Sequence, residues 1–176
     1  MDDLIDDELK IMEEREEEDS QTLNMQTFKE PISELRMPAV KAVEESTTIE
    51  AAIKIMQENH FGSLIIIKNG KLSGIVTERD ILMKACLKID NWSKTPVSQI
   101  MTADPVSLQA TDMIAHVLHN MHVGGFRHIP IVNESGEPIS LVSIKDIVSF
   151  VIEHFPPEII NVVSHPFRGK SIREGA

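Results

Sequence analysis

The chain has 176 residues and is 41% hydrophobic, which is enough for one sizeable domain or for two small modules that share a core. Aromatic residues make up 4% and the formal net charge is −11, so we exclude the basic or aromatic-lined surfaces that usually bind nucleic acids. The single cysteine excludes an internal disulfide and a zinc site made of several cysteines of one chain.

The sequence shows no sign of export or membrane insertion. Its N-terminus is acidic, whereas a secretory signal peptide is basic and then apolar. No stretch approaches the ~18 apolar residues that are needed to cross a membrane. Cys86 lies in an apolar helical pattern and is expected to be a buried thiol, which suits a reducing compartment. We therefore expect a soluble, cytoplasmic protein with no membrane segment.

An acidic segment opens the chain, and we place its end at residue 30. Residues 2–19 contain eleven acidic side chains and only two basic ones, so much of the net charge lies here. Three apolar residues share one side of a predicted helix over residues 1–27, namely Ile5, Leu9 and Met12. The segment is either a solvated, charged stretch or an amphipathic helix that docks on a partner subunit.

A repeat begins at residue 31 and defines two units. A shift of 65 positions pairs Pro31 with Pro96, Ile49 with Ile114, Met56 with Met121, Phe61 with Phe126, and Ile66 with Ile131. After one extra residue in the second unit the shift becomes 66, which pairs Asp80 with Asp146. We therefore expect one domain at 31–90, a second at 91–155, and a polar C-terminal tail at 156–176.

Both units show the same order of elements. In the first unit, the pattern predicts a short strand near Val43, a helix cap at Ser46-Thr47 and a helix over 49–56. A strand over 64–67, a turn at Asn69-Gly70, a strand over 72–76 and a helix after Thr77 follow. After a short strand near Val106, the second predicts a helix over 113–121, strands over 129–132 and 138–142 around a turn at 133–136, and a helix over 145–155. Because a unit of about 60 residues is marginal alone, the two should pack together and bring their last strand-to-helix turns into neighbouring clefts.

These turns carry the motifs Thr77-x-x-Asp80 and Ser143-x-x-Asp146. One interpretation is a helix N-cap with a capping box, in which the hydroxyl accepts an early backbone N–H and the carboxylate reaches back. The other is a ligand site, because free N–H groups at a helix start suit a phosphate, and an ionised Asp can accept two ribose hydroxyls. The same residues can serve both roles.

The duplicated pattern resembles a pair of cystathionine-β-synthase (CBS) domains, the tandem called a Bateman module. The resemblance covers residues 31–155. Besides the element order it rests on four stretches, which are Gly74 to Asp80, Ile100-Met101-Thr102, Phe126 to Val132, and Ser140 to Asp146. It implies an α+β fold in which tandem βαββα domains pack as a pseudo-two-fold pair, and it implies a homodimer.

The resemblance also implies an adenosine-containing ligand in the clefts between the domains, such as AMP, ADP, ATP or S-adenosylmethionine, and no covalent cofactor. Position by position it assigns ribose hydroxyls to Asp80 and Asp146, phosphate or ribose to Thr77 and Ser143, phosphate to Arg127 and His128, and adenine to the backbone near Val43 and Val106. Arg79 and Lys145, inside the two turns, complete the candidate nucleotide-binding residues. Because the sequence has no effector domain, we expect a regulatory module that acts in trans on an unidentified partner protein.

The two units differ at positions that bear on binding. Ser140 replaces the usual glycine before the second turn motif. Gly62-Ser63 stand where the second unit has Arg127-His128, so the charge for a phosphate is unequal. We therefore expect two clefts of unequal affinity.

Three other functions bear on this sequence. His116, His119 and His122 fall on one side of a predicted helix, where they form either a solvated polar face or a metal site completed by another chain. An enzyme is not expected, because the sequence lacks a GxSxG nucleophile motif, an HExxH motif and a P-loop. The third is a constitutive dimerisation scaffold with empty clefts, which a thermal-shift screen with nucleotides would separate from a binder.

Overall fold

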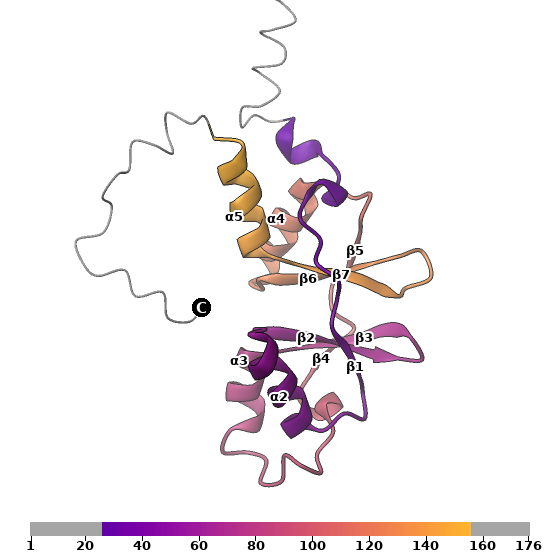
Figure 1. Cartoon of the computed structure of the whole chain (residues 1–176), viewed down its shortest axis with the longest axis vertical. Helices are drawn as coiled ribbons and strands as arrows, with labels where there is room; N and C mark the ends of the chain where they lie inside the picture. Colours follow the sequence, from indigo (N-terminus) through magenta and orange to yellow (C-terminus); the bar gives the residue numbers. More distant parts are fainter. Residues whose placement is uncertain (1–25, 156–176) are drawn as a thin grey trace, which may run out of the picture. The chain divides into compact units, whose positions relative to one another are not determined.

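The computed structural model describes residues 26–155, and its elements are labelled in Figure 1. The chain divides into one compact unit at Phe28–Ile147 and another that joins Met1–Thr27 with Val148–Ala176. The predicted acidic helix and the tail at 156–176 fall almost wholly outside the described residues. Among residues 26–155, no helix has both the length and the apolar character that crossing a membrane requires.

The unit Phe28–Ile147 contains two sheets, one from each sequence repeat. The first has the order β1-β2-β3-β4, with strands at Ala42–Glu44, Ser63–Lys68, Lys71–Thr77 and Thr102–Ala103. The second has the order β5-β6-β7, with strands at Leu108–Gln109, His128–Val132 and Pro138–Ser143. In both, the first pair of strands is parallel and the second antiparallel. The register repeats as well, because Val43 pairs with Ile66 and Leu108 with Ile131.

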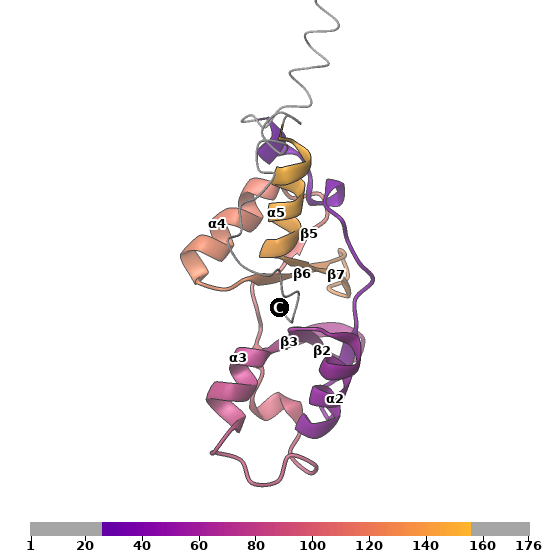
Figure 2. The same cartoon turned by 60° about the vertical axis from the view of Figure 1, so that its left-hand side comes forward.

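Helices complete each repeat and confirm the predicted α+β fold. Helix α2 (Ile49–Asn59) follows β1, and α4 (Ile114–Gly124) follows β5. Each buries side chains three or four positions apart, such as Ile49, Ala52 and Met56, which is the spacing of one helix face. Figure 2 shows α2 and the short helix α3 (Glu78–Asp80) on one face of the first sheet and α4 on one face of the second. Helix α5 (Ile144–Glu153) closes the second β-α-β-β-α series.

Local chemistry explains two boundaries of the first repeat. The helix α2 is capped by Thr48, whose Oγ1 accepts a hydrogen bond from Ala51 N at 3.2 Å, so the cap predicted at Ser46-Thr47 was placed one residue too early. The turn between β2 and β3 has φ of 53° at Asn69 and 77° at Gly70. These left-handed values are those of the tight hairpin turn predicted for Asn-Gly.

The helix after Thr77 differs from its counterpart. It consists of α3 and a π-helix, η3 (Ile81–Ala85), in which Cys86 N donates to Ile81 O at 2.9 Å, whereas α5 is a regular ten-residue α-helix. The helix ends at Cys86, and Leu87 has a φ of 60°. Cys86 is therefore half-buried at a helix end, and the prediction of a buried thiol was wrong.

Each repeat begins with a leading segment that packs on the other repeat. The first leading segment, 31–35, includes the 3-10 turn η2 (Ile32–Glu34), and the second, 96–100, includes η4 (Val97–Gln99). Ile32 N donates to Asp112 O at 2.8 Å, and the equivalent bond from Val97 N to Thr47 O is 2.7 Å. Ile32 and Val97 are fully buried, so each repeat needs the other to complete its core.

A glycine lets the second leading segment return beside the first sheet. Gly74 on β3 pairs with Ala103 on β4, and a Cβ at Gly74 would lie 2.5 Å from Met101 Sδ and 3.0 Å from Thr102 O. A larger residue would require the Met101 side chain to move and would crowd the backbone of Thr102, so glycine favours this approach. The equivalent residue Ser140 instead donates its hydroxyl to Pro38 O at 3.0 Å, which explains why the second repeat tolerates a side chain there.

Of the other unit, the structure describes Gln26, Thr27 and residues 148–155. The rings of Phe150 and His154 lie 4.3 Å apart, and His154 Nδ1 is 2.8 Å from Phe150 O. Val148 and Ile152 on α5 are exposed.

Candidate ligand-binding cleft

One cleft of about 730 Å³ lies within the unit Phe28–Ile147. Its walls come from the turn after β3, from the segment 102–106, and from residues 125–128 at the start of β6. Six of the predicted site residues line it, namely Thr77, Arg79, Asp80, Val106, Arg127 and His128. The cleft therefore joins the turn motif of the first repeat to the basic residues of the second.

The turn at Asp80 forms the predicted capping box. Thr77 Oγ1 accepts a hydrogen bond from Asp80 N at 3.2 Å, and Asp80 Oδ2 accepts one from Thr77 N at 2.9 Å. Thr77 Oγ1 also lies 2.6 Å from Asp80 Oδ2. These bonds fix the carboxylate at the wall of the cleft without any ligand.

The N–H groups of this turn do not point freely at the cleft. Glu78 N donates to the carbonyl oxygen of Gly62 at 3.0 Å, while Asp80 N is used in the capping box. The helix α3 is also only three residues long, so it contributes little dipole. The prediction that free N–H groups at this helix start receive a phosphate is therefore wrong for Glu78 and Asp80, and side chains must supply the positive charge.

A lysine that the sequence analysis missed completes the environment of Asp80. Lys84 Nζ lies 2.7 Å from Asp80 Oδ1, and 3.4 Å from both Met101 O and Thr102 Oγ1. Burial by itself would raise the pKa of Asp80, but the hydrogen bonds from Lys84 and Thr77 outweigh it and hold the pKa below its ordinary value. Asp80 is therefore an anion at neutral pH. The i,i+4 spacing of Asp80 and Lys84 was the available sequence signal.

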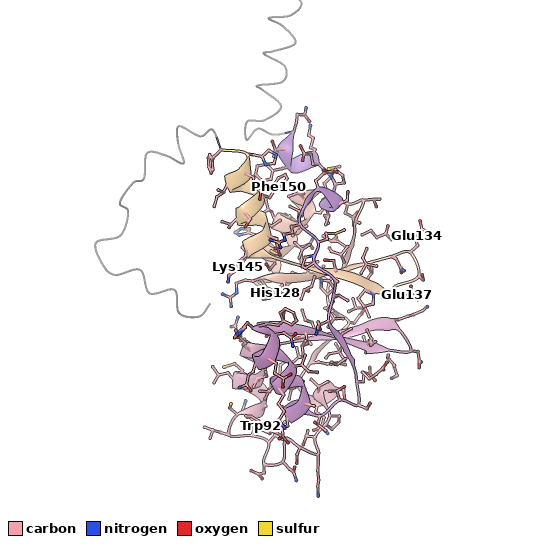
Figure 3. The ribbon with its side chains drawn as sticks, in the orientation of Figure 1. Trp92, His128, Glu134, Glu137, Lys145 and Phe150 are labelled. Carbon is pink, nitrogen blue, oxygen red and sulfur yellow. The ribbon has the colours of Figure 1, made fainter. Side chains whose placement is uncertain are left out.

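The basic side of the cleft contains Arg127 and His128. Burial lowers the pKa of His128, and the neighbouring charge of Arg127 lowers it further, against smaller opposing effects of Glu78 and Asp146. His128 is thus a neutral imidazole at pH 7, and Arg127 supplies the positive charge. In Figure 3 His128 lies at the start of β6, near the start of α5 at Lys145, in accord with its pairing to Ser143.

Four predicted residues do not line this cleft: Val43, Ser143, Lys145 and Asp146. The last three belong to the second turn, where Asp146 Oδ2 accepts a hydrogen bond from Ser143 N at 2.7 Å and lies 2.6 Å from Ser143 Oγ. The sequence analysis placed the leading strands of the two units near Val43 and Val106, but these two residues are not equivalent positions. The register equates Val43 with Leu108, and a shift of 65 equates Val106 with Lys41. Val43 instead packs against the core of the first repeat.

The cleft also contains acidic residues that sequence reasoning missed. Glu78 and Asp104 both line it, and the carboxylate of Glu78 lies over Gly62, with Oε2 3.5 Å from where a Cβ would be. A Cβ at Gly62 would thus be in ordinary contact with the Glu78 carboxylate. Asp104 has a φ of 46° in the segment after β4, where its N–H donates to Ser73 O at 3.0 Å.

The histidines of α4 behave as a solvated face. His116, His119 and His122 are exposed, while Ile114, Val117 and Met121 of the same helix are buried. Within residues 26–155, no three His, Cys, Asp or Glu side chains come together as metal ligands would.

Known proteins match this arrangement. The sequence fits the CBS domain family over residues 32–85 and 97–153, which is more than half of the chain. It is 37% identical over 114 residues to the CBS domain-containing protein CBSCBSPB5 of Arabidopsis thaliana, a match that covers 64% of this chain and 21% of that protein. It is 33% identical over 124 residues to an uncharacterized 17.7 kDa protein of Acidianus ambivalens, a match that covers 69% of this chain and 73% of that protein.

A solved structure shows the same fold. A CBS domain protein from Pyrobaculum aerophilum, complexed with AMP, superimposes with a TM-score of 0.62 at 24% identity, over 76% of this chain and 97% of that one. The chain spans about a fifth of the Arabidopsis relative, so the activity of that whole protein is a separate matter.

The lowered pKa of His128 predicts how stability depends on pH. Its pKa in the unfolded chain is near 6.5, and the folded chain binds that proton more weakly. The stability that neutral His128 contributes to the folded chain is therefore fully present above about pH 6.5. It is lost as the pH falls toward the folded-state pKa. We expect urea unfolding to show a larger loss of stability between pH 7.5 and 5.5 for the parent than for His128→Gln. Equal losses in the two proteins would contradict the assigned pKa.

Proposed function

Because this chain belongs to the CBS domain family, we propose that it is a regulatory module that binds an adenosine-containing ligand in the cleft at Asp80. The observation that carries the proposal is the meeting of Asp80 with Arg127 and His128 in one cleft. An ionised carboxylate accepts two hydroxyl donors, which suits a ribose, and an arginine beside a histidine suits a phosphate. The AMP complex of the related fold from Pyrobaculum aerophilum supports this ligand class.

The basic side of the cleft suits a phosphate-bearing ligand better than S-adenosylmethionine. Arg127 lies there next to His128, whereas Lys84 is paired with Asp80, so Arg127 is the cation that would attract a phosphate and repel a sulfonium. Val106 and Pro105 offer an apolar wall for an adenine ring. AMP, ADP and ATP remain within this class, and the bound ligand is not covalent.

The second cleft is proposed to be weaker. Ser143, Lys145 and Asp146 repeat the first turn, but Gly62 and Ser63 stand where the first cleft has Arg127 and His128. A phosphate at the second site would therefore lack an arginine partner. We assign the module domains at 31–90 and 91–155 with flanking segments at 1–30 and 156–176.

The module is proposed to act by binding rather than by turnover, on a partner protein in trans. This follows from the CBS family and from a cleft whose charged residues suit recognition of a nucleotide. A reducing compartment such as the cytoplasm suits a chain with one cysteine.

The decisive experiment replaces the two motif aspartates. Asp80→Asn and Asp146→Asn, singly and together, should lower AMP affinity by about tenfold or more, because the amide loses the anionic acceptor that a ribose needs. Isothermal calorimetry measures the affinity. The amide oxygen of asparagine can still accept the hydrogen bond from Thr77 N or Ser143 N, so the free energy of unfolding should fall by only about 1 kcal/mol or less.

Asp112→Asn is the matched control. Asp112 Oδ2 accepts a hydrogen bond from Gln109 N at 2.7 Å, the same local arrangement outside the cleft, so this variant should bind as the parent does. If the double variant binds AMP like the parent, both aspartates are only caps. If the parent itself binds no adenosine ligand, a scaffold with empty clefts is the better description.

Arg127→Ala tests the phosphate assignment. A charge-assisted hydrogen bond contributes about 1.5 to 3 kcal/mol, so AMP affinity should fall by roughly tenfold to a hundredfold while adenosine affinity stays the same. Lys54→Ala, which breaks an exposed ion pair with Glu50 on α2, serves as a control for the loss of one positive charge. Equal losses for AMP and adenosine would show that Arg127 does not contact phosphate.

The module is also proposed to be a homodimer. The side chains of Leu82, Met83 and Leu87 in and after η3 are exposed by 65%, 58% and 107%, and apolar surface of this kind usually binds a partner. Light scattering should give twice the chain mass of 19.7 kDa at micromolar concentration. A monomer under these conditions would rule out this assembly.

A further inference from the structure

Lys84 occupies the carboxylate oxygen of Asp80, Oδ1, that a ribose would need. Asp80 Oδ2 is held by Thr77 within the capping box, and Oδ1 is held by Lys84 Nζ at 2.7 Å. Each carboxylate oxygen has two lone pairs, and those of Oδ2 are used by the N–H and hydroxyl of Thr77, so two ribose hydroxyls need both lone pairs of Oδ1, one of which Lys84 occupies. The capping bonds come from the same short turn, whereas the ammonium group sits on a flexible side chain, so Lys84 is the partner that can leave.

The two partners of this ion pair differ in exposure. The Asp80 side chain is 13% exposed and that of Lys84 is 42% exposed. Moving Lys84 into water therefore has a small penalty, while Asp80 without any partner would be a poorly solvated charge. An incoming hydroxyl pair can replace the ammonium group as the partner of Asp80.

The ion pair belongs to one repeat only. A shift of 66 places Phe150 at the position of Lys84, so the equivalent carboxylate Asp146 has no lysine four residues later. Lys84 also lies on the π-helix η3, which interrupts the helix in the first repeat alone. Neither feature is a general consequence of the duplicated fold.

Lys84 also connects η3 to the wall of the cleft. Its Nζ lies 3.4 Å from Met101 O and from Thr102 Oγ1, and Thr102 begins β4. Lys84 thus links Asp80 to the start of β4, so a movement of its side chain away from Asp80 can alter the contact between η3 and β4. The outer residues of η3 include the exposed Leu82 and Met83.

We propose that Lys84 is an internal competitor for Asp80, which a ligand must displace in order to bind Asp80 through a pair of hydroxyls. The proposal rests on the proposed function, because it takes Asp80 as the acceptor of the ribose. Lys84 then acts as a positioning residue that sets the affinity of the cleft for a diol, and its release from Asp80 reports occupancy to η3.

Adenosine is the appropriate probe, because it has the diol but no phosphate that Lys84 could attract. Lys84→Met keeps the length of the side chain and removes the ammonium group, so adenosine affinity should rise about threefold to tenfold in calorimetry. Lys84→Arg keeps the charge and should bind adenosine as the parent does. For 2′,3′-dideoxyadenosine, which lacks the diol, Lys84→Met and the parent should have equal affinity.

Two further variants serve as controls for a general effect of the substitution on folding. Lys54→Met removes a lysine from an i,i+4 ion pair with Glu50 outside the cleft and should leave adenosine binding unchanged. Lys84→Gln replaces Lys84→Met if the latter is not folded by circular dichroism. A gain of affinity for both adenosine and its dideoxy analogue would indicate a wider cleft and would overturn the proposal.

The remaining outcomes separate this inference from the proposed function. If the parent binds adenosine and Lys84→Met binds it equally or more weakly, the competitor role is wrong while the ligand class stands. If only Lys84→Met binds adenosine, the competitor role is supported in its strongest form. If neither binds adenosine or AMP, the proposed function and this inference both fail.

Discussion

Four backbone hydrogen bonds that cross between the repeats hold the structure together. Val97 N binds Thr47 O and Ile49 N binds Thr95 O, and the same two bonds recur 65 residues apart, from Ile32 N to Asp112 O and from Ile114 N to Glu30 O. The bonds from Ile49 N and Ile114 N satisfy the first N–H groups of α2 and α4, which no intrahelical acceptor can reach, and the other two hold the leading segments in place. Because each leading segment also fills the other core, neither repeat of about 60 residues is complete alone.

The packing of each leading segment on the other repeat also creates the cleft. The chain leaves the second leading segment at residue 100 beside β3, where Gly74 permits the close approach of Met101 and Thr102. The pairing of β3 with β4 then places residues 102–106 next to the turn at Asp80. A site made of three separate stretches thus depends on one glycine and on the crossing bonds, far more than on any helix dipole.

Features that depend on neighbouring residues could be predicted from the sequence, and features that depend on packing could not. The Asn69-Gly70 turn, the capping box of Thr77 with Asp80 and the bond from Ser143 N to Asp146 follow from side-chain chemistry within four residues. The contacts of Lys84 with Met101 and Thr102 join residues 17 and 18 positions apart, and neither these contacts nor the π-helix η3 is revealed by apolar periodicity. The error at Val43 has a different cause, because the register that equates it with Leu108 becomes clear only once the strands are paired.

The duplication has left one cleft with a balanced set of charges. Three basic residues, Arg79, Lys84 and Arg127, and three acidic ones, Glu78, Asp80 and Asp104, line it, and His128 is neutral at pH 7. At the equivalent positions the second repeat has Ile144 for Glu78 and Phe150 for Lys84. A cleft with equal numbers of both charges attracts an anion weakly at long range, so it must recognise its ligand by exchanging one ion pair for another at short range. Selectivity in such a site comes from which pairs the ligand can replace, and the Asp80–Lys84 pair is the one with a flexible, half-exposed partner.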